Sequence, residues 1–291
     1  MDLTEYGRIT SLLVSRRGEI VHEQYVEGDE GTLRNTRSCT KTVLGMLIGI
    51  AIDEGSIRGV DATLGELLPD RSLDSAKASI TMDQLLSMSS SLECNDWDER
   101  SPGNEERMYP TRDWVQFALD LPLRSAGGFS YCTAGVVLLG VAVARALGVR
   151  LSEFAARELF PAAGIDRFRW PTSPRGEDSA AGGLLLTSRG LLELGSLYLQ
   201  GGGGVVSHSW VDVSTRPHAQ IDAETEYGYL WWLRSFAGQR SYYMSGMGGN
   251  RVHVFPELEL VAVITTKNFE VAGAHELSDR LLVDAVLARY G

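Results

Sequence analysis

Residues 37–55 read Arg-Ser-Cys-Thr-Lys-Thr-Val-Leu-Gly-Met-Leu-Ile-Gly-Ile-Ala-Ile-Asp-Glu-Gly, and this stretch decides the predicted fold. Every residue from Val43 to Ile52 is apolar or glycine, so a helix here leaves no polar face for water. A helix that is apolar on all sides is typical of the interior of a large protein. Gly55 supplies a stop at the C-terminal end. The stretch therefore predicts a buried central helix around which the rest of the chain is organised.

The start of this helix carries a hydroxyl and an amine. Ser38 precedes Lys41 by three residues, which places both side chains on one face of the first turn. The unpaired backbone N–H groups there favour developing negative charge. A serine needs a base to become a good nucleophile, and a lysine in apolar surroundings can have its pKa lowered towards neutrality. The pair predicts a nucleophilic Ser38 assisted by Lys41; the alternative is that Ser38 only caps the helix.

The composition is that of a globular protein with an acidic balance. The 291 residues carry a formal net charge of −11. A chain of this length can bury a sizeable core, as one large domain or two interleaved lobes. Because binding to nucleic acid needs clustered cations, and none occur, we expect no nucleic-acid partner. The apolar runs are shorter than the roughly 20 residues of a bilayer span, and residues 1–5 do not resemble a signal peptide, so we expect a cytoplasmic protein without a membrane partner.

Cysteines and histidines show no spacing typical of metal ligands. Cys39, Cys94 and Cys132 are an odd number of cysteines, which suits a reducing compartment. Cys39 and Cys132 each neighbour a candidate catalytic residue, and we interpret them as small core residues rather than a redox pair. The five histidines are scattered, without an H-E-x-x-H pair or a Cys/His cluster. We expect neither a metal nor another cofactor.

Extended segments lie at both ends of the chain, with helical segments between them. A hairpin is predicted at the N-terminal end and an antiparallel meander near the C-terminal end, at residues 9–15, 19–26, 228–236, 240–245, 250–255 and 258–266. Helical patterns cover 81–88, 111–120, 133–147, 151–159, 187–200, 207–214 and 272–290. The order predicts an α+β fold: an antiparallel sheet formed by both chain ends, flanked by helices, with an inserted all-α lobe.

The lobes meet where the active site is expected. We assign residues 1–60 and 205–291 to the lobe with the antiparallel sheet and residues 61–204 to the helical lobe, with the active site between them. The four glycines at 201–204 are interpreted as a linker between the lobes. A long polar loop at 93–109 is either a lid or pocket wall, or a solvated connector.

Two further stretches carry candidate chemistry. Residues 129–133, Phe-Ser-Tyr-Cys-Thr, lead into an apolar helix. A phenol beside a lysine ammonium can ionise below its usual pKa of roughly 10, so Tyr131 could be the general base for Ser38; the alternative is a packed core tyrosine. Residues 243–250, Tyr-Met-Ser-Gly-Met-Gly-Gly-Asn, join two predicted strands. Their glycines either let the backbone approach a ligand closely or make a turn.

In this order, the stretches Ser38-x-x-Lys41, Tyr131-x-Thr133 and Met244–Gly246 resemble the motifs of the serine β-lactamase, penicillin-binding protein and family VIII esterase superfamily. The resemblance covers nearly the whole chain and is closest to the branch of class C β-lactamases, esterases and 6-aminohexanoate-dimer hydrolase-like proteins. Residues 85–92 and 181–189 are similar to two further segments of that branch. No G-x-S-x-G stretch occurs in the sequence, which weighs against an α/β-hydrolase.

The resemblance implies a role for each matching residue. Ser38 would be the acylated nucleophile, Lys41 its proton partner, and Tyr131 the base that later protonates the leaving group. The backbone N–H groups of Ser38 and Met247 would form the oxyanion hole. Residues expected to contact the substrate are Thr133, Met244, Ser245 and Gly246, with Trp97, Tyr109 and Trp231 as candidate pocket walls.

Two departures from the family pattern bear on the substrate. Cys132-Thr133 replaces the usual Ser-Asn after the tyrosine, so the carboxamide that orients a substrate amide is absent. Met244 stands where the family has lysine or histidine, so the cation that anchors a β-lactam or D-alanyl carboxylate is expected to be missing. Both departures point away from antibiotics and peptidoglycan.

The sequence thus predicts a serine hydrolase that cleaves a small ester or amide through an acyl-enzyme on Ser38. The alternative of the same mechanism is an acyltransferase that uses a small amine or alcohol as acceptor in a biosynthetic pathway. Two further alternatives are a β-lactamase and a non-catalytic binding homologue. The presence of Ser38, Lys41 and Tyr131 disfavours the binding homologue.

Overall fold

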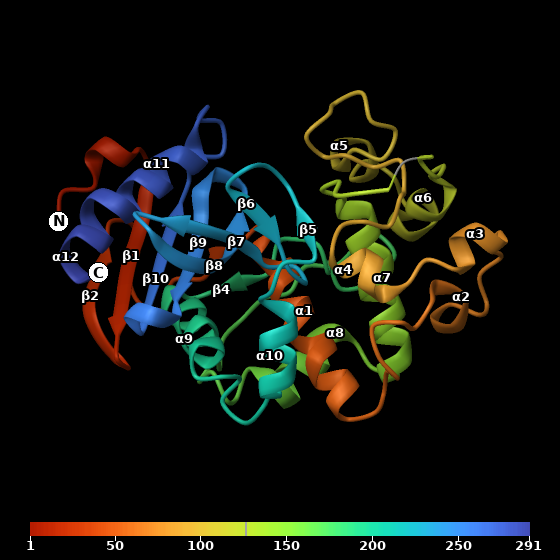
Figure 1. The fold of residues 1–291 in the computed structure, drawn as a ribbon, viewed down its shortest axis with the longest axis horizontal. Helices are drawn as coiled ribbons and strands as arrows, with labels where there is room; N and C mark the ends of the chain where they lie inside the picture. The colour runs from red at the N-terminus through yellow and green to blue at the C-terminus, as the bar shows by residue number, and fades with distance from the viewer. Residues whose placement is uncertain (126) are drawn as a thin grey trace.

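The structure, a computed structural model, describes residues 1–125 and 127–291 and contains one large antiparallel sheet (Figure 1). Its eight strands lie in the order β2-β1-β10-β9-β8-β7-β6-β5. The strands are β1 (Ile9–Arg16), β2 (Glu19–Tyr25), β5 (Ala219–Gln220), β6 (Thr225–Tyr227), β7 (Trp232–Phe236), β8 (Gln239–Gly246), β9 (Asn250–Phe255) and β10 (Leu260–Thr266). The hairpin β1–β2 joins the meander through β10, with Leu13 opposite Val263. Both ends of the chain therefore complete one sheet, and the predicted α+β fold is confirmed.

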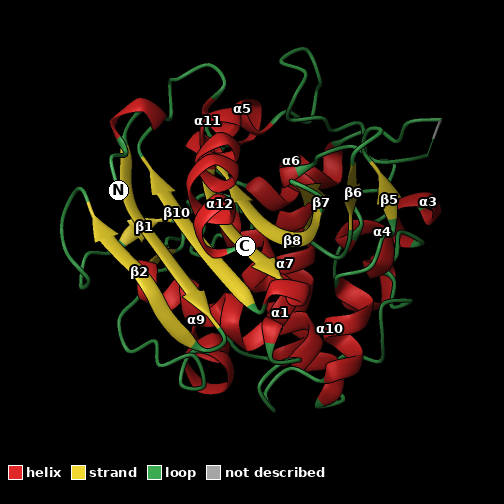
Figure 2. Ribbon diagram, turned by 60° about the vertical axis from the view of Figure 1, so that its left-hand side comes forward, coloured by secondary structure: helices red, strands yellow, loops and turns green. Residues whose placement is uncertain are grey.

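The helices divide between the sheet and the inserted part of the chain (Figures 1 and 2). They are α1 (Cys39–Asp53), α2 (Leu64–Leu67), α3 (Ser75–Ala78), α4 (Met82–Leu86), α5 (Glu105–Met108), α6 (Trp114–Asp120), α7 (Thr133–Leu147), α8 (Leu151–Phe154), α9 (Ser188–Leu199), α10 (His208–Ser214), α11 (Ala274–Leu281) and α12 (Ala288–Tyr290). In Figure 1 the sheet with α11 and α12 occupies the left, α2 to α7 the right, and α1 the middle.

Strand β1 shows how the sheet is covered on both faces. Leu13 belongs to the core that contains the side chains of α9, whereas Leu12 and Val14 belong to the core formed with α11 and the residues after it. Successive side chains of a strand point to opposite faces. A strand that is buried at every position but the last is therefore an interior strand between two helical layers.

Helix α1 is buried on all sides, as its sequence predicts. The indole of Trp210, on α10, lies directly against Gly49 and donates from Nε1 to the carbonyl of Gly45 at 3.0 Å. A Cβ at Gly49 would overlap that indole. Gly49 thus lets α10 pack closely on α1, and this contact helps to fix the helix that begins immediately after Ser38.

Several sequence expectations need correction. Helix α9 was assigned to the helical lobe, but it packs on β1, β9 and β10 and so belongs to the sheet layer. Residues 228–231 form a turn rather than the start of a strand, because Gly228 N–H donates to the carbonyl of Trp231 at 2.8 Å and Leu230 has a φ of 60°. A second sheet, of β3 (Arg34–Asn35) and β4 (Leu185–Leu186), was not predicted because its strands have only two residues each.

Among residues 1–125 and 127–291, no single helix is long and apolar enough to cross a bilayer. The segments Thr133–Leu147 and Leu151–Leu159 meet the criteria only when taken as a pair, with a bend of 64° between them.

Candidate active site

Ser38 and Lys41 lie together at the start of α1. Lys41 donates from Nζ to Ser38 Oγ at 3.0 Å and to the carbonyl of Ala181 at 2.6 Å. The lysine is only 1% exposed. Ser38 occupies the position before the helix, but its side chain makes no capping hydrogen bond. The interpretation of Ser38 as a mere helix cap is therefore wrong, and its hydroxyl is left to interact with the amine.

Tyr131 completes this arrangement from the segment that precedes α7. Its side chain is 8% exposed and forms a hydrogen bond with Ser38, and the Lys41 ammonium lies 5.1 Å from the centre of its ring. Burial raises the pKa of Tyr131 above its usual value, and the nearby Lys41 ammonium and the Ser38 hydrogen bond only partly oppose this. The expectation of a phenol that ionises readily beside lysine is wrong. The resting phenol keeps its proton and is suited to donate it.

A pocket of about 500 Å³ opens onto Ser38 and Tyr131. Trp97 and Trp232 form an aromatic wall: the Trp97 ring lies parallel to that of Tyr131 at 5.7 Å, and the Trp232 ring lies 5.6 Å from it. Met247, the first residue after β8, also lines the pocket. An oxyanion hole made by the N–H groups of Ser38 and Met247 stays a prediction. The predicted residues that line the pocket are Ser38, Tyr131, Trp97, Ser245, Gly246 and Met247.

Four residues predicted to bind substrate are not among those that line the pocket. Met244 is buried between its neighbours Tyr243 and Ser245, both of which do line it. Likewise Trp231 packs on the rings of Tyr198 and Tyr242, and the next residue, Trp232, faces the pocket. Adjacent side chains of an extended chain point to opposite sides, so an error of one residue changes the face. The other two are Thr133 and Tyr109, and both contact a residue that does line the pocket.

The residue that both Thr133 and Tyr109 contact is Glu105, the first residue of α5. Thr133 Oγ1 donates to Glu105 Oε2 at 3.0 Å, and the Tyr109 hydroxyl donates to the same oxygen at 2.9 Å. Glu105 itself lines the pocket. A carboxylate thus lies beside Thr133, the position at which the family carboxamide is missing. Glu105 was not predicted from the sequence, because no motif around it indicates a functional residue.

Asp96 is the second carboxyl group on this side of the pocket. Its Oδ2 accepts from Thr133 N–H at 2.7 Å and its Oδ1 accepts from Glu105 N–H at 2.9 Å. Burial, together with the charge of Glu105, raises the pKa of Asp96 to about 6 despite these hydrogen bonds and the Lys41 ammonium. Asp96 and Trp97 both come from the loop at 93–109, so its interpretation as a pocket wall is confirmed.

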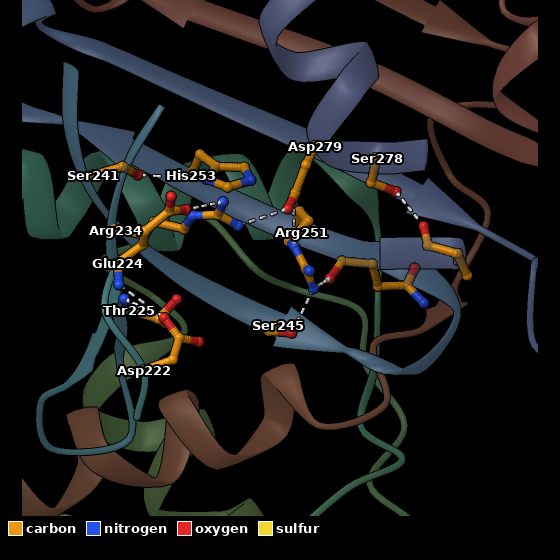
Figure 3. Close-up of polar contacts among 12 residues, drawn as sticks. Asp222, Glu224, Thr225, Arg234, Ser241, Ser245, Arg251, His253, Ser278 and Asp279 are labelled. Carbon is orange, nitrogen blue, oxygen red and sulfur yellow. Dashed lines mark hydrogen bonds and ion pairs between the residues drawn. The ribbon is translucent and has the colours of Figure 1, made fainter. Parts of the chain in front are cut away.

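The opposite wall, from the sheet, carries arginine (Figure 3). Arg251 on β9 donates from Nη1 to Ser245 Oγ, and its Nε lies 3.5 Å from Asp279 Oδ1. Arg234 on β7 also reaches Asp279, with its Nη1 3.5 Å from Oδ2. The expectation that the pocket lacks a cation is therefore wrong. Arg251 is directly opposite Ser245 in the β8–β9 register, and that pairing across a short turn is the signal that could have found it.

Two ionisable groups beside Arg251 have shifted pKa values. Burial raises the pKa of Asp279, although Arg251 and Arg234 oppose the shift. Burial, with the charge of Arg251, lowers the pKa of His275 to about 3, so this imidazole stays neutral. The charge of the sheet-side wall at neutral pH is therefore carried by the arginines and carboxylates, and His275 contributes none.

The family model named Beta-lactamase matches residues 8–287. The chain belongs to the beta-lactamase family. A curated relative, 6-aminohexanoate-dimer hydrolase from Paenarthrobacter ureafaciens, is 28% identical over an alignment of 287 residues that covers 87% of this chain and 71% of the relative. The penicillin-binding protein from Bacillus halodurans superposes with a TM-score of 0.79 at 17% identity, over 99% of this chain and 98% of that one. EstCE1, described as a hydrolase with promiscuous acyltransferase activity, superposes with a TM-score of 0.77 at 16% identity, over 96% and 95%.

The cysteines of this beta-lactamase family protein differ from expectation. Cys132 is buried in the core and does not pair with Cys39, but it forms a disulfide with Cys94 that the sequence did not predict. Cys39 is buried and unpaired, and burial raises the pKa of its thiol to about 12. The sequence could not predict the pairing because the two cysteines are 38 residues apart and have no recognisable spacing.

Within the part of the chain that the structure describes, no group of three or more His, Cys, Asp or Glu side chains is arranged to hold a metal ion.

Proposed function

We propose that this protein is a serine hydrolase that cleaves a small ester or amide through an acyl-enzyme on Ser38. The observation that carries the proposal is the 3.0 Å hydrogen bond from buried Lys41 to Ser38 Oγ, beside Tyr131 and at the floor of an open pocket. A serine hydroxyl in contact with an amine and a phenol has both a proton acceptor and a proton donor within reach. The membership of the beta-lactamase family supports this reading.

The mechanism gives each of the three groups one role. Ser38 Oγ attacks the substrate carbonyl carbon while its proton passes to Lys41, which takes part in this step as the neutral amine. The N–H groups of Ser38 and Met247 would stabilise the oxyanion. Tyr131, whose raised pKa favours the protonated phenol, donates its proton to the leaving oxygen or nitrogen and is reprotonated from Lys41. Water then attacks the Ser38 ester, releases the acid and regenerates the hydroxyl.

The charges of the pocket walls suggest the kind of substrate. Asp96 and Glu105, from the loop at 93–109 in the inserted part of the chain, line the pocket. Arg251 lines it from the sheet side, together with Arg234 and Asp279. A small amide with an ammonium on its acyl part and a carboxylate on its leaving part would meet an opposite charge at each end. The named substrate of the Paenarthrobacter relative, a dimer of an amino acid, is an amide of this general kind. We propose such amides, and the corresponding esters, as the substrate class.

Acyl transfer is the second candidate. The exposed Trp97 ring, 58% accessible and stacked on Tyr131, gives a small amine or alcohol an apolar surface next to the proton donor. EstCE1, which shares the fold, is described as having acyltransferase activity. Adding an amine or alcohol during turnover would divert product from the acid to the amide or ester if this reading is correct.

A labelling experiment tests the proposal directly. A fluorophosphonate should add once to the intact protein, and peptide mapping should locate the adduct on Ser38. The Ser38→Ala variant should take no label and should release no p-nitrophenol from p-nitrophenyl acetate above the background rate. A label on another residue, or turnover that survives in Ser38→Ala, would contradict the assignment.

A further inference from the structure

The disulfide between Cys94 and Cys132 lies directly behind the catalytic tyrosine. Its Cα atoms are 5.3 Å apart, and it joins two segments separated by 38 residues. Tyr131 is the residue immediately before Cys132, and Asp96 and Trp97 follow Cys94 by two and three residues. The bond therefore fastens the backbone that carries the proton donor to the loop that carries one wall of the pocket.

The same two segments are linked by hydrogen bonds that converge on Tyr131. Asp96 N–H donates to the Tyr131 carbonyl at 2.9 Å, and Ser130 Oγ donates to the Cys94 carbonyl. Thr133 N–H donates to Asp96 Oδ2 at 2.7 Å. The Trp97 ring also lies parallel to the Tyr131 ring, with 3° between the planes. Any movement of residues 94–97 is thus transmitted to both the main chain and the ring of the tyrosine.

We propose that the Cys94–Cys132 disulfide is a positioning device for Tyr131, and that its reduction converts the enzyme to a slow form. The inference rests on the proposed function, because Tyr131 is taken to donate the proton to the leaving group. Hydrogen bonds alone let residues 94–97 separate from 130–133 and return, whereas the covalent bond limits that separation. Proton donation requires the phenol within a few tenths of an ångström of its productive position, so the effect falls on the chemical step.

The redox step needs an external dithiol. One thiolate of the dithiol attacks one sulfur of the disulfide, and its second thiolate resolves the mixed disulfide. The dithiol loses two electrons and two protons and becomes a cyclic disulfide, while Cys94 and Cys132 gain them as two thiols. Cys94 is 1% exposed and Cys132 is 3% exposed, so the reductant reaches them only when the loop opens and reduction is slow.

Cys39 does not compete in this exchange. It is buried on α1, and no disulfide includes it in the part of the chain that the structure describes. A thiol without thiolate character is a poor partner in thiol–disulfide exchange, and burial favours the protonated form of Cys39. The number of free thiols therefore reports the state of the Cys94–Cys132 pair alone: one when the pair is oxidised and three when it is reduced.

The experiment compares the oxidised and reduced forms of the intact chain. The protein is incubated with dithiothreitol, and its free thiols are counted by alkylation in denaturant and intact mass. Turnover of p-nitrophenyl acetate is then measured on each form at 25 °C, with circular dichroism to confirm the fold. We expect kcat to fall at least about tenfold on reduction, with KM changed less than about threefold. Equal kcat in the two forms, within about twofold, would overturn the inference.

Variants separate a positioning role from a general loss of stability. In the double variant Cys94→Ser/Cys132→Ser, a serine at 132 can still accept from Gly135 N–H, which lies 3.1 Å from the sulfur. This variant should have the rate of the reduced protein and should not respond to dithiothreitol. In Tyr131→Phe the residual rate should be the same, within about twofold, in both redox forms. If reduction still slows Tyr131→Phe about tenfold, the bond does not act through the tyrosine and the inference is wrong.

Failure of the proposed function would look different. If the oxidised protein neither turns over p-nitrophenyl acetate nor forms a fluorophosphonate adduct, the hydrolase assignment falls, and the inference falls with it. If the oxidised protein is active and reduction has no effect, only the inference falls.

Discussion

The catalytic centre and the walls of the pocket are built differently. Ser38 directly precedes α1 and Lys41 lies in its first turn three residues later, so their contact follows from local helical geometry. Glu105 begins the short helix α5 and Arg251 lies on β9, and each is held by a side chain from another segment, Thr133 and Ser245. The catalytic centre should therefore act on every substrate, whereas the walls should discriminate among substrates. Variants of the centre should lower activity on all substrates, and variants of the walls should lower activity only on some.

The largest expected effect is at the centre. Lys41→Arg keeps a positive charge but cannot exchange a proton near neutral pH, so acylation should fall at least about a hundredfold for neutral and charged esters alike. Stopped-flow measurement of the p-nitrophenol burst checks this, with circular dichroism as the control for folding. Acylation at the wild-type rate would mean that Lys41 acts only through its charge.

Arg251 should affect only substrates that carry a carboxylate on the leaving group. A charge-assisted hydrogen bond contributes about 1.5 to 3 kcal/mol, so Arg251→Gln should lower kcat/KM for 4-acetoxybenzoate by about 10- to 150-fold. The methyl ester of 4-acetoxybenzoate lacks the charge and should be turned over as by the wild type. The control variant is Arg240→Gln, since Arg240 pairs with Glu226 at the surface and does not line the pocket. Equal losses on both substrates would indicate that Arg251 only supports the sheet.

How far the sequence predicts the molecule depends on the range of the interactions. The apolar run at 43–52 and the alternating strands predict the central helix and the sheet, because helix and strand periods are local properties. Ser38 and Lys41 were predictable for the same reason. Arg251 was not assigned to the pocket, because a cation was sought in the motif at Met244, whereas the neighbouring strand supplies it opposite Ser245. Whether Trp231 or Trp232 faces the pocket depends on which side of the extended chain each side chain occupies, and the composition does not determine this.

A smaller, selective loss is expected on the acidic wall. Glu105→Gln keeps an acceptor oxygen for Thr133 and Tyr109 but removes the charge, so the fold of the wall should persist. We expect kcat/KM for p-nitrophenyl 6-aminohexanoate to fall about tenfold, with p-nitrophenyl hexanoate unchanged. The matched control is Glu106→Gln, because Glu106 is the exposed neighbour of Glu105 and does not line the pocket. A loss shared by both esters would mean that the wall has moved and that charge is not the cause.

The smallest effect should be a pH dependence of the same selectivity. The pKa of Asp96 is raised to about 6, so this carboxyl is neutral below that pH and ionised above it. The ionised form attracts an ammonium, and therefore the ratio of kcat/KM for p-nitrophenyl 6-aminohexanoate to that for the hexanoate should rise with pH, by roughly three- to tenfold through the region near pH 6. The ratio cancels any titration of the catalytic groups, since both esters share them. Asp96→Asn removes the titrating group, so in that variant the ratio should not change between pH 5 and about 7.5. Because Asp96 also accepts hydrogen bonds from the N–H groups of Thr133 and Glu105, the absolute rates of the variant should fall for both esters. A ratio that keeps its rise in Asp96→Asn would assign the titration to another carboxyl group of the pocket.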